Sequence, residues 1–194
     1  MKKALILLVA CLAIGISAGW TSPIQAENTL NAKLLLHGVQ KDTSSHWGKD
    51  GWFILPNPGS KTTPVVAVAG PRYSQSNWWL ELNLGVFGKE SKAEALLDVR
   101  ASYDLTAKWN VWANVEYYGT SKNLYVYLDA TLKLGSIGRI GLETENMLYG
   151  DHQVDDYGYG PRIVVPFGSQ FKLIGAYQFH PGLDKIWARV VIDF

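Results

Sequence analysis

The chain has 194 residues, of which 47% are hydrophobic, 12% aromatic and only 18% charged. This composition excludes a disordered tail protein, and a net charge of +1 provides no basic field for binding nucleic acid. The single cysteine, Cys11, excludes a disulfide framework and a cysteine-based zinc site.

The N-terminal segment has the order of a secretory signal peptide. Two lysines precede an apolar run over 4–18, and Ala26 supplies a small residue before a polar start. We therefore expect residues 1–26 to be a cleaved signal peptide and residues 27–194 to form the mature domain. An uncleaved membrane anchor and lipidation at Cys11 are the alternatives.

Most of the remaining chain alternates apolar and polar side chains, the period of a β-strand whose two faces meet different surroundings. The pattern predicts about ten strands, near 29–39, 62–73, 77–87, 92–104, 108–118, 123–134, 138–149, 156–167, 170–180 and 185–194. Short turn-forming clusters separate them, and residues 40–61 form one long connection. This spacing predicts an all-β, antiparallel up-and-down barrel. An eight-stranded barrel over 77–194, with residues 27–73 as a plug or an added hairpin, is the alternative.

The two faces of these strands differ in charge. The apolar faces carry almost none, whereas the polar faces carry both signs. A charge facing lipid costs a few kcal/mol near the bilayer midplane, so this distribution favours a transmembrane barrel with a polar lumen over a soluble periplasmic ligand-binding barrel. The predicted lumen network comprises Arg72, Glu81, Asp98, Arg100, Glu116, Asp129, Lys133, Arg139, Glu143, Arg162, Lys172 and Arg189.

Aromatic residues gather at one predicted end of the apolar faces, as in the girdle of a membrane barrel. They are Tyr73, Trp78, Tyr103, Trp109, Phe167, Phe171 and Phe194. An even strand number would bring both ends of the barrel sequence to this rim. The connection 40–61 and all four histidines, His37, His46, His152 and His180, would then lie at the other rim. With nearby aspartates such as Asp50 and Asp156 they could bind a divalent cation or titrate near neutral pH. Their spacing matches no compact metal motif, so we predict a hydrated loop surface and no metal site.

The chain ends on Phe194 after an alternating strand, and this ending resembles the C-terminal signature of bacterial outer-membrane barrels. The resemblance implies a place in the outer membrane among lipid and lipopolysaccharide. It also implies that the barrel-assembly machinery reads the last strand, with Phe194 as the assembly signal.

The sequence offers no motif for a cofactor or a catalytic centre. Ser44, Ser45, His46 and Asp50 lie close together, but on the predicted connection, which does not position them. We therefore expect a non-enzymatic barrel with a largely filled lumen, acting as a structural protein or as a narrow, porin-like channel for small solutes. The alternative is a lipid A-modifying or proteolytic barrel enzyme that acts at the outer rim.

Overall fold

The computed structural model describes residues 29–42, 44–58, 63–90, 92–150 and 156–194. The expected signal peptide over 1–26, Cys11 and His152 lie outside these ranges. Within them the chain forms eleven strands. They are β1 (Thr29–Lys41), β2 (Trp47–Pro56), β3 (Val65–Ser74), β4 (Trp78–Lys89), β5 (Lys92–Asp104), β6 (Trp109–Tyr118), β7 (Leu124–Lys133), β8 (Arg139–Leu148), β9 (Asp156–Phe167), β10 (Phe171–Gln178) and β11 (Lys185–Asp193).

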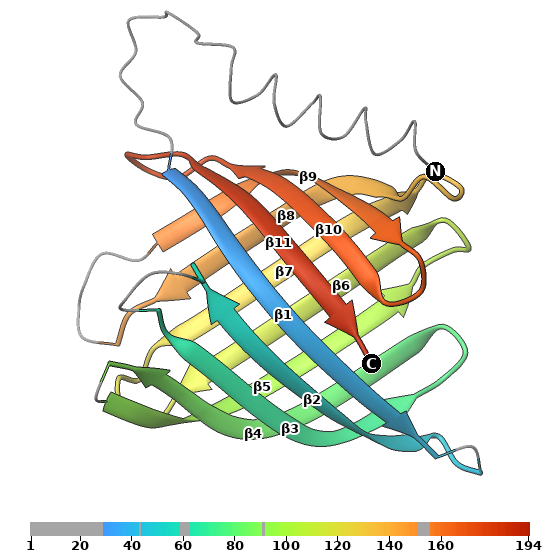
Figure 1. Ribbon diagram of the computed structural model, residues 1–194, viewed down its shortest axis with the longest axis horizontal. Helices are drawn as coiled ribbons and strands as arrows, with labels where there is room; N and C mark the ends of the chain where they lie inside the picture. The colour runs from blue at the N-terminus through green and yellow to red at the C-terminus, as the bar shows by residue number, and fades with distance from the viewer. Residues whose placement is uncertain (1–28, 43, 59–62, 91, 151–155) are drawn as a thin grey trace, which may run out of the picture.

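The strands close into a barrel in chain order (Figure 1). Each strand pairs with the next in antiparallel register, and β1 closes the ring by pairing with β11 in parallel. Closure leaves no strand edge unpaired. The predicted all-β, up-and-down barrel is confirmed. The part of the chain that the structure describes contains no helix long and apolar enough to cross a bilayer.

The strand number is eleven rather than ten, and the eight-stranded alternative is wrong because residues 29–74 supply three strands of the wall. The missed strand is β2, which lies inside the predicted long connection. Its outward positions include Lys49 and Gly51 and its inward positions include Gly48 and Asp50, so no apolar alternation stands out. Glycine and aspartate are also depleted in strands.

An odd strand number changes the position of the chain ends. Because β1 and β11 run in parallel, β1 begins at one rim and Phe194 lies at the other (Figure 1). We call the rim that holds Phe194 and the β1–β2, β3–β4, β5–β6, β7–β8 and β9–β10 connections the C-terminal rim. The expectation that both ends share a rim is therefore wrong.

The three described histidines therefore lie at two different rims of the barrel. His37 lies opposite Asp193 near the C-terminal rim, and His46 hydrogen-bonds the carbonyl of Ser74 at that same rim. His180 lies at the opposite rim beside Asp156. The predicted gathering of histidines is wrong for His37 and His46, because the extra strand returns the chain across the barrel between them and β3.

Candidate functional site

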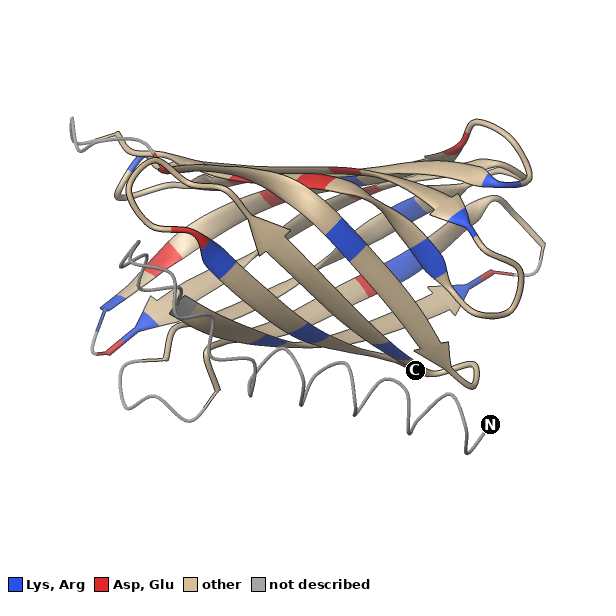
Figure 2. Ribbon diagram, turned by 90° about the horizontal axis from the view of Figure 1, so that it is seen from above, with Lys and Arg blue, Asp and Glu red and all other residues tan. Residues whose placement is uncertain are grey.

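The barrel is polar inside and apolar outside. On β4 the outward residues Leu82 and Leu84 are 51% and 69% exposed, whereas the residues that alternate with them, Glu81 and Asn83, are 0% exposed. Figure 2 shows acidic and basic residues along the length of the wall and not only at its ends. The alternation read from the sequence therefore separates an ionic interior from an apolar exterior.

Nine of the twelve residues of the predicted lumen network are buried in the interior. They are Arg72, Glu81, Asp98, Arg100, Glu116, Asp129, Glu143, Arg162 and Arg189. Lys133 is exposed, and Arg139 and Lys172 are half-buried near the C-terminal rim. Lys172 pairs with Asp193 at 2.6 Å, whereas the ion pairs of the described residues do not include Lys133 or Arg139. The interior residues form two separate networks.

The first network lies toward the C-terminal rim and begins with Glu81. Arg72 donates to Glu81 Oε1 at 2.6 Å, and the indole N–H of Trp52 donates to Oε2 at 3.0 Å. Arg72 and Glu81 are direct neighbours on β3 and β4, an opposite-charge cross-strand pair. Both carboxylate oxygens of Glu81 thus have donors.

Arg100 holds the next part of this network. Its Nε and Nη2 donate to the two oxygens of Asp98 at 2.9 and 2.8 Å, the fork geometry of a strong guanidinium–carboxylate pair. Glu116 lies 3.5 Å from Arg100 and accepts from Asn114 and Tyr118, each at 2.7 Å. The amide of Asn83 on β4 also donates to Asp98 at 3.2 Å, so these bonds join β4, β5 and β6 from the inside.

The second network joins strands that are far apart in sequence. Arg189 donates to Glu143 at 2.9 and 2.8 Å and to Glu145 at 2.8 Å. Lys33 on β1 pairs with Glu145, and Arg162 pairs with Asp129. Further donors complete the network: Tyr125 to Glu145, Tyr127 to Glu143, and Gln178 to Glu143. Its three carboxylates thus meet three cationic side chains.

Part of the interior is apolar, a feature that the division into apolar and polar strand faces does not predict. Buried Ile54, Val66, Val68, Leu96 and Tyr118 pack together, with Leu35, Trp52, Phe87, Tyr125 and Met147 against them. These apolar residues lie on the same inward faces as the charged residues, so alternation alone did not distinguish them. Together with the two networks they fill much of the lumen.

Other residues were missed for definable reasons. Asp50 belongs to the unpredicted β2. Lys33 and His37 lie on the strand with the weakest alternation, and Glu145 is two residues beyond Glu143 on the same face. The alternation of inward and outward positions over 29–41 and 139–148 was the signal that could have identified Lys33, His37 and Glu145.

Aromatic side chains form two belts on the outside. Tyr73, Trp78, Tyr103, Trp109, Phe167, Phe171 and Phe194 lie near the C-terminal rim, and Trp47 packs on Tyr73 with ring centroids 5.1 Å apart. Near the opposite rim the outward aromatic residues include Phe53, Tyr117, Tyr157, Tyr159, Tyr177 and Phe179. The second belt was not predicted.

The residues considered for hydrolysis do not assemble. Ser44 and Ser45 both donate their hydroxyls to Asp42, at 2.6 and 3.1 Å. His46 contacts the Ser74 carbonyl instead, and Asp50 points into the lumen. The hydrogen bonds from Ser44 hold the pKa of Asp42 below its ordinary value, with a smaller contribution from Ser45. This group forms the turn between β1 and β2.

The interior ion pairs hold the strands together. The inward side chains of Glu81, Asn83, Asp98 and Gln178 are 0% exposed, so the side chains around them leave no accessible space beside them. At the C-terminal rim a polar recess of about 200 Å³ is lined by Lys41, Arg72, Ser74, Asp104 and neighbouring residues. Searches of protein-family models, curated proteins and solved structures found no match to this chain.

Proposed function

We propose that the protein is an integral β-barrel of the bacterial outer membrane, with a structural role or a narrow small-solute path rather than a wide pore. The observation that carries this proposal is the arrangement of the wall: leucine and valine side chains point outward while ion pairs are enclosed. A soluble barrel with this exterior would expose a continuous apolar surface to water.

The two aromatic belts support the proposal. Tyrosine and tryptophan prefer the bilayer interface, and membrane barrels carry such a girdle at both interfaces. Strand β6 has Trp109 outward near one end and Tyr117 outward near the other. Strands of 8 to 13 residues also match the roughly 9–11 residues that a tilted strand needs to cross a bilayer.

Outward polar residues are compatible with lipid because they bond one another. Thr144 and Asn146 lie on the outer face of β8, and the Asn146 amide donates to the Thr144 hydroxyl at 2.9 Å and to the carbonyl of Val126 at 3.4 Å. A polar group in hydrocarbon is costly unless it has such a partner.

The filled lumen favours a structural role over free diffusion. Two ionic networks and the apolar cluster around Leu96 occupy the interior, so any path for solute has to run between large side chains. In this proposal the outer belts contact lipid and lipopolysaccharide. The C-terminal strand, with Phe194 73% exposed, is the segment that the assembly machinery reads.

The localisation test is cell fractionation followed by electrophoresis. We expect the protein in the outer-membrane fraction, extractable only with detergent, with a change of mobility on boiling. A purified chain lacking residues 1–26 that stays folded and monomeric in plain buffer would overturn the proposal.

The channel test is single-channel recording in planar bilayers. We expect at most small conductance steps. Large, steady conductance typical of a water-filled porin would contradict the filled lumen, and complete absence of conductance would leave the structural role alone.

A further inference from the structure

The two interior networks differ in the ratio of carboxylates to cationic side chains. In the second network Asp129, Glu143 and Glu145 are matched by Lys33, Arg162 and Arg189. The first network also includes Asp50, which the Asn83 amide joins to Asp98 at 3.5 and 3.2 Å. With His37 neutral, its four buried carboxylates are matched by only two arginines: Asp50, Glu81, Asp98 and Glu116 against Arg72 and Arg100. Buried charges require compensation, so this half of the lumen lacks about two positive charges.

The imbalance centres on two carboxylates from the strands on either side of β3, Asp50 of β2 and Glu81 of β4. Both are among the buried residues of the interior, and a ligand oxygen of each lies within 4.8 Å of the other and of an imidazole nitrogen of His37. Nearby, the buried amide oxygen of Asn83 accepts no hydrogen bond from the described residues. The region is rich in acceptors and short of cations.

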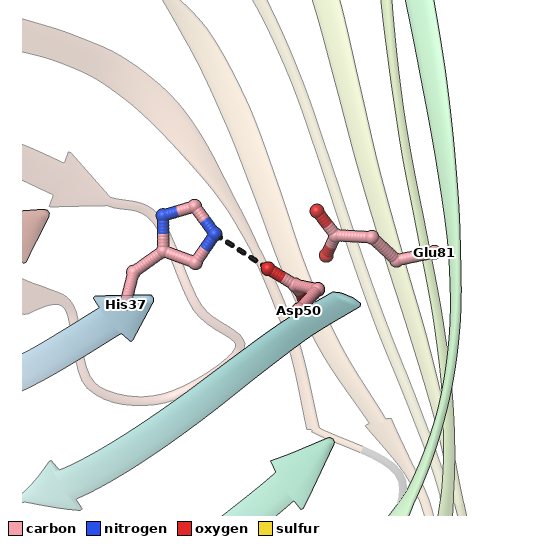
Figure 3. A group of neighbouring side chains, drawn as sticks. All are labelled: His37, Asp50 and Glu81. Carbon is pink, nitrogen blue, oxygen red and sulfur yellow. Dashed lines mark hydrogen bonds and ion pairs between the residues drawn. The ribbon is translucent and has the colours of Figure 1, made fainter. Parts of the chain in front are cut away.

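His37 is held in the orientation of a metal ligand. Its Nδ1 lies 2.8 Å from Asp193, and its ring stacks on Trp52 with centroids 3.9 Å apart. The other nitrogen, Nε2, points to Asp50 Oδ1 at 2.7 Å, while Glu81 reaches toward the same space from the opposite side (Figure 3). A carboxylate on the far nitrogen of a ligating histidine is the usual support of such a ligand.

We propose that His37, Asp50 and Glu81 bind a divalent transition-metal cation of the Zn²⁺ class inside the barrel near its C-terminal rim. One imidazole and two carboxylates provide a three-ligand N/O set, which leaves a position for water. Two positive charges equal the deficit of the surrounding network. The cation replaces the His37–Asp50 hydrogen bond and links β1, β2 and β4, which lie on one side of the barrel wall.

An access route exists at the rim. The side chains of His37 and Asp193 are 12% and 25% exposed, whereas that of Asp50 is fully enclosed. Of the three proposed ligands, His37 is therefore the one that an ion arriving from the C-terminal rim contacts first.

The test is Zn²⁺ binding to the folded full chain in detergent micelles after treatment with EDTA, followed by equilibrium dialysis. We expect one ion per chain, with X-ray absorption reporting nitrogen and oxygen ligands at roughly 2.0–2.2 Å. His37→Gln and Glu81→Gln should each abolish binding. Asp193→Asn should weaken it by roughly 10–100-fold, because it removes only the support of His37.

The matched control is His180→Gln. His180 also pairs with an aspartate, Asp156 at 2.7 Å, but at the opposite rim. We expect this variant to bind Zn²⁺ as the parent does, with unchanged heat-modifiable mobility in every variant. The proposal is overturned if the parent binds no Zn²⁺, if folded His37→Gln or Glu81→Gln binds normally, or if His180→Gln loses binding equally. A proton shared between Asp50 and Glu81 would then balance the charge.

Discussion

Arg189 shows how much a single interior side chain can support. It lies 5% exposed between Glu143 and Glu145, and its removal takes two hydrogen bonds from Glu143 and leaves Glu145 with Lys33 as its cationic partner. The Coulombic gain of such a pair largely offsets its desolvation, so the pair as a whole adds little. Removing one partner is costly because it leaves the remaining charges buried and unpaired.

We therefore predict that Arg189→Met lowers the free energy of unfolding by about 3–5 kcal/mol, measured by denaturant titration in lipid vesicles. Lys133→Met is the control, since Lys133 is exposed near the C-terminal rim, and should change stability by less than about 0.5 kcal/mol. Equal effects of the two variants would show that the interior network does not carry this energy.

At the scale of the strand, glycines allow neighbouring backbones to approach closely. A Cβ on Gly141 of β8 would lie 2.0 Å from the carbonyl oxygen of Ala130, whereas one on Gly38 of β1 would meet nothing within 4 Å. Glycine inside a strand commonly marks a bend or a close approach of this kind. The two positions are thus a natural matched pair.

Gly141→Ala should destabilise the barrel by about 1–3 kcal/mol, since the added methyl forces β7 and β8 apart. Gly38→Ala should be neutral or slightly stabilising, because it restricts the unfolded chain without a clash. Comparing the two denaturation midpoints under identical conditions checks the prediction. A loss of stability in Gly38→Ala of the same size would contradict it.

Prolines within two strands interrupt the ladder without shifting its register. Pairing of β3 with β4 resumes at Arg72↔Glu81 in the register set by Ala69↔Leu84, although Pro71 donates no hydrogen bond. The repeated Gly-Pro-Arg segments at 70–72 and 160–162 both direct an arginine into the lumen, to Glu81 and Asp129 respectively. The sequence predicted both inward arginines correctly.

At the scale of the whole molecule, the parallel pairing of β1 with β11 decides how the barrel closes. Leu34 lies directly opposite Val190 in this pairing, and Leu173 lies beyond Val190 on β10. Neighbouring strands are about 4.8 Å apart, so a disulfide can join adjacent strands but not alternate ones.

In a Cys11→Ser background, Leu34→Cys with Val190→Cys should form a disulfide under mild oxidation, seen as a mobility shift that reductant reverses. Leu34→Cys with Leu173→Cys should not. Efficient cross-linking of the second pair would mean that the ring closes without β11 next to β1.

The outward surface can be probed by adding one charge. Leu82 points outward midway along β4, and Ile137 lies in the β7–β8 connection at the C-terminal rim. In a bilayer, Leu82→Arg should cost about 2–4 kcal/mol and Ile137→Arg about 0–1 kcal/mol, because the cost of a cation falls toward the interface. The readout is unfolding free energy in vesicles. Similar small costs at both sites would argue against a lipid-facing wall.

The period-two pattern was sufficient to predict most strands, the inward parity of the charged residues and the aromatic rim near Phe194. Alternation is a local property, and each strand displays it without reference to its neighbours. It failed at β2, where glycine and charge conceal the period, and this one omission changed the strand number, the rim of β1 and the position of His37.

Outside β2, local alternation was enough to assign the inward side chains, because successive residues of a strand must point to opposite sides. Which of these inward residues meet depends on how the strands are arranged around the ring. Lys33 reaches Glu145, and His37 lies beside Asp50 and Asp193, because closure in register brings together strands that begin and end the chain. Pairing across a closed ring depends on the strand count and stagger of the whole wall, and no single segment encodes these.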